Sequence, residues 1–127
     1  MKIVYAEDDP LVRQSIATLL AGQGVDVLEA GDGEEAIWLC RVFHPDVVLL
    51  DLGMPQMDGF ETARRLRETP AGRMLRIVAL TAYGDVEHQR MAKQAGFDEF
   101  LGKPISMNTI VNALRLCNQD SSSRCAR

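Results

Sequence analysis

Residues 47–51 read Val47-Val48-Leu49-Leu50-Asp51, four consecutive apolar residues that end on a carboxylate. A run that is apolar at every position is typical of a strand covered on both faces, as in a parallel sheet. Amphipathic segments separate this run from four others, at 3–6, 25–28, 77–80 and, more weakly, 97–101. The alternation predicts an α/β fold: a doubly wound, five-stranded parallel sheet with helices on both faces.

Helix signals fill the segments between these runs. Asp9 before Pro10 predicts an N-cap with proline at the first helical position, and Gly22 and Gly96 stand where helices are expected to stop. Apolar stripes at helical spacing give the segments a core-facing side. The stripes are Val12, Ile16, Leu19 and Leu20 in the first segment, Ala36, Ile37 and Cys40 in the second, and Ile110, Val111 and Leu114 in the last. A basic run is interpreted as a solvated helix face: Arg64, Arg65 and Arg67.

Composition limits the classes of function. The chain has 127 residues, of which 46% are hydrophobic and 25% are charged, as expected for one globular domain. Its formal net charge of -4 argues against direct binding to nucleic acid or to an anionic membrane. No apolar run approaches the roughly 20 residues that span a bilayer, and acidic residues at 7–9 interrupt the start too early for a signal peptide. We therefore expect a cytoplasmic protein with no membrane partner.

The domain is expected to span residues 1–117. The polar segment 118–127 lacks a buried face and is expected to be a disordered tail. The three cysteines, Cys40, Cys117 and Cys125, have no metal-binding spacing. Cys40 is expected in the core.

Polar residues follow four of the five predicted strands. Glu7 and Asp8 come after the first strand, Asp51 ends the third, Thr81 ends the fourth, and Lys103 follows the fifth. In an open α/β sheet the ligand crevice lies outside the carboxyl ends of the strands, so these side chains are expected to meet there. The second strand ends without such a residue, as expected of an edge strand that does not reach the crevice.

Three crowded carboxylates repel one another and require a cation, and Lys103 supplies only one positive charge. Oxygen ligands without His or Cys select a hard ion such as Mg²⁺, which keeps some of its waters. With the hydroxyl of Thr81 added, the groups suit phosphoryl transfer, and Asp51 is the natural nucleophile and acceptor.

The motifs around these residues resemble the receiver domain of two-component response regulators. They are Tyr5-Ala6-Glu7-Asp8-Asp9, the stretch 48–59 that reads VLLDLGMPQMDG, Ala79-Leu80-Thr81-Ala82, and Phe100-Leu101-Gly102-Lys103-Pro104. The likeness spans residues 2 to about 117, nearly the whole chain. It implies the flavodoxin-like strand order 2-1-3-4-5, as in CheY-like proteins.

The resemblance also implies roles for the acidic residues. Asp51 is expected to accept a phosphoryl group from a histidine kinase or a histidine phosphotransfer protein, with Mg²⁺ as cofactor. Asp8 resembles a direct metal ligand, and Glu7 resembles an acidic neighbour that acts largely through water. Gly53 resembles a third protein ligand through its backbone carbonyl, and Gly59 is interpreted as a structural turn glycine.

A conformational switch is expected to follow phosphorylation. Thr81 can gain a charge-assisted hydrogen bond by moving toward the phosphoryl group, and a neighbouring aromatic side chain can fill the space it leaves. The resemblance implies Phe100 as that aromatic residue, Lys103 as the ammonium that pairs with the phosphoryl group, and a cis peptide bond before Pro104. The surface of the fourth predicted helix, the fifth strand and the fifth helix would then change and bind a downstream protein partner.

The main alternative is a Mg²⁺-dependent phosphatase or phosphotransferase that forms an aspartyl-phosphate intermediate. Such enzymes place a second Asp two residues after the nucleophile, where this chain has Gly53. We therefore expect a switch rather than a multi-turnover enzyme. A nucleotide-binding interpretation of Gly22-Gln23-Gly24 is weak because these residues follow a helix and lack a third glycine. The sequence leaves open whether the receiver stands alone or comes from a hybrid kinase.

Overall fold

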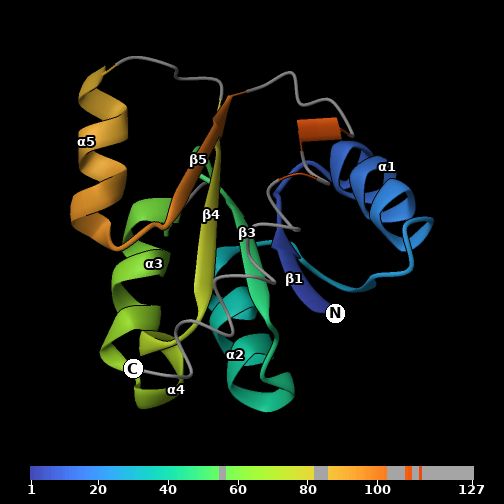
Figure 1. The fold of residues 1–127 in the computed structure, drawn as a ribbon, viewed down its shortest axis with the longest axis horizontal. Coiled ribbons are helices and arrows are strands. Elements are labelled where there is room, and N and C mark those ends of the chain that lie inside the picture. Colours follow the sequence, from blue (N-terminus) through green and yellow to red (C-terminus); the bar gives the residue numbers. More distant parts are fainter. Residues whose placement is uncertain (55–56, 82–85, 103–107, 110–111, 113–127) are drawn as a thin grey trace.

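Five short strands pair side by side in one parallel sheet (Figure 1). A computed structural model describes residues 1–54, 57–81, 86–102, 108–109 and 112. The strands run in the order β2-β1-β3-β4-β5, which confirms the predicted fold class and strand order. They are β1 (Lys2–Ala6), β2 (Asp26–Ala30), β3 (Val47–Asp51), β4 (Arg76–Thr81) and β5 (Glu99–Gly102).

Helices cover both faces of the sheet, with α1 on one side and α2, α3 and α5 on the other (Figure 1). The helices are α1 (Pro10–Ala21), α2 (Gly33–Phe43), α3 (Gly59–Glu68), the short α4 (Pro70–Arg73) and α5 (Val86–Ala95). The sequence analysis did not predict α4. It is one turn long, begins with Pro70 after the N-cap Thr69, and immediately precedes β4.

The core consists of two clusters, one on each face of the sheet, because side chains alternate between the faces along each strand. Val4, Val48 and Ile77 belong to the cluster that α2, α3 and α5 cover. Ile3 and Leu49 belong to the cluster that includes Leu20 of α1. All five residues of β3 are buried, as the unbroken apolar run predicts.

The predicted helix ends are confirmed where the structure describes them. Asp9 caps α1, and its side chain accepts a hydrogen bond of 2.9 Å from the backbone N–H of Leu11. Gly22 is the C-cap of the same helix. Gly96 directly follows α5 with a φ of 103°, a left-handed conformation that glycine adopts without steric cost.

Two strands differ from the predicted runs by more than one residue at one end. The second strand is shifted toward residue 30 relative to the predicted 25–28, and β5 begins at Glu99 rather than at Phe97. Phe97 is buried against Phe60 outside the strand, with ring centroids 6.2 Å apart in an edge-to-face arrangement. An apolar residue that packs before a strand begins carries the same local signal as one inside the strand, so the pattern placed the start too early.

The α1 stripe is buried only in part. Leu20 is fully buried and Ile16 packs partly against the core, whereas Val12 is 38% exposed and Leu19 is 51% exposed. In the second helix Ala36 is buried, and the prediction that Cys40 is a core residue is confirmed. No helix among the described residues has both the length and the apolar character that a membrane span requires.

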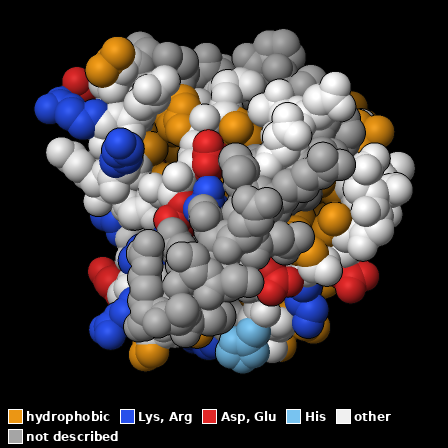
Figure 2. Space-filling model, in the orientation of Figure 1, with side chains coloured by type: hydrophobic (Ala, Val, Ile, Leu, Met, Phe, Trp, Pro, Cys, Tyr) orange, Lys and Arg blue, Asp and Glu red, His pale blue; other side chains and the backbone are white. Residues whose placement is uncertain are grey.

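The interpretation of the basic run as a solvated face is wrong for Arg67. Arg64 and Arg65 are exposed and pair with Glu61 on their own helix, and Figure 2 shows Lys and Arg side chains along the side of the molecule that α3 and α5 form. Arg67 instead forms an ion pair of 2.7 Å with Asp98 and donates to the carbonyl of Gly96 at 2.9 Å. The Arg67 side chain is only 20% exposed.

Candidate functional site

Three carboxylates meet beyond the carboxyl ends of β1 and β3. Glu7 and Asp8 follow β1, and Asp51 is the last residue of β3. One carboxylate oxygen from each of the three residues lies within 4.8 Å of the others. Glu7 and Asp51 are buried and Asp8 is exposed. The structure therefore brings together all three acidic residues that the sequence analysis selected.

The turn after β1 is held by Arg13 of α1, which the sequence analysis did not select. Its guanidinium donates a hydrogen bond of 2.8 Å to the backbone carbonyl of Glu7 and lies 3.3 Å from a carboxylate oxygen of Glu29 in β2. An arginine on a helix gives no local sign of a partner on a distant edge strand. Arg13 thus fixes the backbone from which Glu7 and Asp8 extend.

Asp51 is positioned by the loop that follows it. Its Oδ1 accepts a hydrogen bond of 3.0 Å from the backbone N–H of Gly53. A Cβ on Gly59, the first residue of α3, would lie 2.8 Å from the carbonyl oxygen of Asp51 and 2.9 Å from the Cα of Leu52. The start of α3 can approach the phosphoacceptor candidate this closely only because residue 59 has no side chain.

Thr81 ends β4 and is buried, and β4 pairs with both β3 and β5. Phe100 of β5 lies opposite Ala79 in the register and packs, partly buried, against the core cluster of α2, α3 and α5. Because side chains two residues apart point to the same face of a strand, Thr81 extends from the face to which Ala79 belongs. The hydroxyl and the aromatic ring therefore belong to the same side of the sheet.

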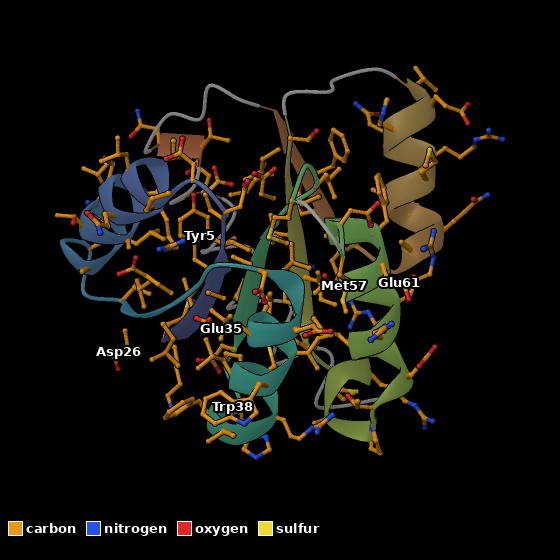
Figure 3. The ribbon with its side chains drawn as sticks, turned by 180° about the vertical axis from the view of Figure 1, so that it is seen from behind. Tyr5, Asp26, Glu35, Trp38, Met57 and Glu61 are labelled. Atoms are coloured by element: carbon orange, nitrogen blue, oxygen red, sulfur yellow. The ribbon has the colours of Figure 1, made fainter. Side chains whose placement is uncertain are left out.

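The negative electrostatic potential of the carboxylates also acts on Tyr5 in β1. This side chain is fully buried in β1, beside α1 (Figure 3). Burial raises the pKa of the Tyr5 phenol well above its usual value, and the charges of Glu7 and Asp51 raise that pKa further. A field that opposes ionisation of a neighbouring phenol also favours a bound cation.

The donor set fits a hard divalent cation. Its three side chains supply only carboxylate oxygens, which Mg²⁺ and Ca²⁺ prefer, and no His or Cys belongs to the group. Asp8 is exposed, so an ion bound here could keep several of its waters, as Mg²⁺ does. Glu7, Asp8 and Asp51 are the residues that could hold it.

Two predicted site residues, Lys103 and Pro104, lie outside the described residues, as does the stripe Ile110, Val111 and Leu114. The described part of β5 ends at Gly102, opposite Thr81 in the register. The segment 118–127, expected to be a disordered tail, also lies outside the described residues. The expectations for all of these residues stay predictions.

The similarity of this chain to known proteins covers nearly its whole length and is not confined to the site residues. A family model described as the response regulator receiver domain matches residues 3–115. The transcriptional regulatory protein PdtaR of Mycobacterium tuberculosis is 35% identical over 116 residues, which cover 91% of this chain. The chain spans only 55% of the length of PdtaR.

Solved structures agree with the fold. The chemotaxis protein CheY4 of Vibrio cholerae is similar with a TM-score of 0.87 and 28% identity, over 91% of this chain and 97% of that one. The receiver domain of the sensor histidine kinase PA1611 of Pseudomonas aeruginosa has a TM-score of 0.82 and 27% identity, over 95% of this chain and 97% of that one. In that structure a magnesium ion is coordinated in the active-site cleft.

Proposed function

The chain belongs to the response regulator receiver family, and from that premise we propose that it is a phosphoacceptor switch in a two-component phosphorelay. In this proposal Asp51 accepts a phosphoryl group from a histidine kinase or a histidine phosphotransfer protein. The observation that carries the proposal is the convergence of Glu7, Asp8 and Asp51 on one point beyond the sheet.

Glu7, Asp8 and Asp51, together with the backbone carbonyl of Gly53, would hold Mg²⁺. Support comes from the all-oxygen donor set and from the magnesium ion in the PA1611 receiver domain. When bound, the ion would neutralise charge on the phosphoryl oxygens during transfer. Asp8 is the exposed member of the three, so it is the member through which an ion would enter from solvent.

In the transfer step, a carboxylate oxygen of Asp51 attacks the phosphorus atom of the donor. An O–P bond to Asp51 forms while the bond from phosphorus to the donor breaks, and the leaving group departs with that electron pair. The Gly53 N–H, 3.0 Å from Oδ1 of Asp51, holds the carboxylate in one orientation before the attack. We further propose that Lys103 supplies a compensating positive charge.

The switch would follow from the position of Thr81. Its hydroxyl ends β4, next to β3, and could donate a charge-assisted hydrogen bond to a phosphoryl group on Asp51. Phe100, only partly buried, would move inward to occupy the space that Thr81 leaves. The surface that changes would comprise α5, β5 and the last helical segment, and a downstream protein would bind there.

We propose that this signalling takes place in the cytoplasm, with no direct contact to nucleic acid. We also propose that residues 1–117 form the receiver domain. The chain is expected to carry one phosphoryl group at a time and to lose it by hydrolysis, rather than to turn over external substrates as an enzyme. These points rest on the family and on the negative net charge of -4.

The test is intact-mass spectrometry after incubation with acetyl phosphate and Mg²⁺. The wild-type protein should gain the mass of one phosphoryl group per chain, and Asp51→Asn should gain none. Asp26→Asn is a matched control, because Asp26 is exposed at the opposite end of β2 from the site (Figure 3). Added mass that persists in Asp51→Asn would falsify the assignment of the acceptor.

The same reaction separates the switch from the phosphatase alternative. A switch consumes acetyl phosphate only as fast as its own phosphoryl group is hydrolysed. An enzyme would release many equivalents of phosphate from several small phosphate esters. Sustained turnover of such esters by the wild-type chain, lost in Asp51→Asn, would contradict the switch and support the alternative.

A further inference from the structure

A second concavity lies at the end of the sheet opposite the carboxylates. Pro45 and Asp46 precede β3 and Leu75 precedes β4, so the cavity opens at the amino ends of these two strands. It lies between the last turns of α2 and α3 and the short helix α4, which Figure 1 shows at that end of the molecule. The site described above does not use it.

The cavity has a volume of about 570 Å³ and a mostly apolar lining. Its apolar wall includes Ile37, Cys40, Leu66, Pro70, Met74 and Leu75. Pockets of roughly 300–1,000 Å³ with an apolar lining and a few polar groups are typical of small-molecule sites. Met74 is 52% exposed and adds apolar surface to the lining.

The polar residues around the cavity differ in whether they are already engaged. The hydroxyl of Thr69 donates to the carbonyl of Leu66 at 2.8 Å and accepts from the N–H of Gly72 at 3.0 Å. Oδ2 of Asp46 accepts a hydrogen bond of 2.9 Å from the backbone N–H of Lys2. Both residues therefore serve the fold, and neither needs a ligand.

Arg41 is the exception among the charged residues of this lining. Within the described part of the chain most arginines form ion pairs: Arg13, Arg64, Arg65, Arg67, Arg76 and Arg90. Arg41 lines the cavity and forms no such pair with any described residue. Arg41 is exposed and belongs to the lining, and a planar guanidinium is suited to a carboxylate or sulfonate group.

We propose that this cavity binds a small amphipathic anion, with its hydrocarbon part against Ile37, Leu66 and Leu75 and its anionic group at Arg41. Apolar lining and one available cation together select this class over two others. A purely apolar molecule would leave Arg41 unused, and a small hydrophilic anion would leave the apolar wall uncovered. The carboxylates of the phosphoacceptor site lie at the other end of the sheet, and the carboxylate in the lining, Asp46, accepts from the backbone N–H of Lys2.

Three probes separate the contribution of the anionic group from that of the hydrocarbon chain: sodium octanoate, octanol and sodium butyrate. Each is titrated into the full chain while methyl NMR signals of Ile37, Leu66 and Leu75 are followed. Octanoate should shift these signals in a saturable way. Octanol should bind about tenfold more weakly, because about 1.4 kcal/mol from one charge-assisted hydrogen bond is a factor of ten. Butyrate should bind at least 100-fold more weakly, since each buried methylene is worth about fourfold.

Two variants and a matched control locate the ligand. Arg41→Glu should weaken octanoate binding at least tenfold and leave octanol binding unchanged. Lys93→Glu makes the same charge change on the exposed side of α5 and should leave both unchanged. Ala71→Leu adds volume at the exposed rim of the cavity and should weaken both octanoate and octanol. Urea unfolding of each variant verifies that the fold is retained.

The proposal is overturned if octanoate fails to saturate the three methyl signals, or if octanol binds as tightly as octanoate. It is also overturned if Arg41→Glu and Lys93→Glu affect octanoate equally. Asp51→Asn should bind octanoate as the wild-type chain does. Loss of phosphorylation and loss of octanoate binding are therefore separate results, and the failure of one proposal leaves the other standing.

Discussion

Replacing Arg67 with alanine should destabilise the protein far more than its place in a basic helical run suggests. The guanidinium joins two connections: it donates to the carbonyls of Gly72 and Leu75 before β4, and to the carbonyl of Gly96 and the carboxylate of Asp98 between α5 and β5. Oδ2 of Asp98 also accepts from the N–H of Ile77, at 2.9 Å. One side chain thus holds the connections that lead into two adjacent strands.

The magnitude follows from these contacts. The ion pair with Asp98 has side chains that are 20% and 14% exposed, so solvent screens it only in part. A hydrogen bond that involves a charged group contributes about 1.5–3 kcal/mol to stability, and a buried acceptor left without its donor costs about 1–3 kcal/mol. Allowing for water that replaces the donor at some carbonyls, we expect Arg67→Ala to lower the free energy of unfolding by about 3 kcal/mol.

Urea denaturation followed by circular dichroism measures this change. With a denaturant slope of about 1.5–2 kcal/mol per M, the midpoint should fall by about 1.5–2 M. Arg64→Ala is the matched control: the same substitution on the same helix removes a pair with Glu61 whose side chains are 53% and 42% exposed. Such a surface pair contributes at most about 1 kcal/mol.

Arg67→Lys tests whether the planar guanidinium matters beyond its charge. Lysine keeps the charge but cannot serve several acceptors in one plane, so it should recover less than half of the loss. Equal midpoints for Arg67→Ala and Arg64→Ala would refute the reasoning, because Arg67 would then behave as an ordinary surface residue.

Three further predictions concern packing, titration and the metal. Gly59→Ala should lower stability by about 1–3 kcal/mol in urea unfolding, because its Cβ would meet backbone atoms at 2.8 and 2.9 Å. Gly102→Ala, with nothing within 4 Å of the added Cβ, should change it by less than about 1 kcal/mol; equal losses would contradict the steric cause. Burial raises the pKa of the Cys40 thiol to about 12, above the roughly 8.5 of an unfolded chain. The folded state therefore holds this proton more tightly, so stability that is complete below about pH 8.5 should fall as the pH rises toward 12. Cys40→Ala should reduce that fall in the urea midpoint between pH 9 and 11, and an unchanged fall would exclude the thiol as a contributor. Asp8→Asn should weaken Mg²⁺ binding at least about tenfold in NMR titrations without unfolding the chain, and an unchanged affinity would remove Asp8 from the proposed ligands.

The fold and the acidic cluster could be predicted because their signals are local. Four apolar residues before Asp51, two of them β-branched, favour a buried strand of a parallel sheet, and Asp9 before Pro10 predicts the start of a helix. Once the strands are parallel, their carboxyl ends lie at one edge. The meeting of Glu7, Asp8 and Asp51 then follows from connectivity, although these residues are far apart in the sequence.

Strand ends were less certain because apolar side chains near a strand resemble those within it. Phe97 is buried against Phe60 and yet lies before β5, so its hydrophobicity misplaced the start of that strand. In α1, Leu19 has the spacing of a core residue but is 51% exposed. Periodicity gives the direction of a helix face, whereas the extent of burial depends on what packs against it.

Only the tertiary structure decided which polar side chains serve as connectors. Arg64 and Arg67 look alike in sequence, but Arg67 reaches Asp98 and Gly96, which lie about 30 residues away. Arg13 reaches Glu7 and Glu29 for the same reason, and the cavity beside Arg41 exists only because α2, α3 and α4 end near one another. The spacing of apolar residues and the charge of each side chain can be read from the local sequence. The partners of a side chain depend instead on how the helices dock onto the sheet.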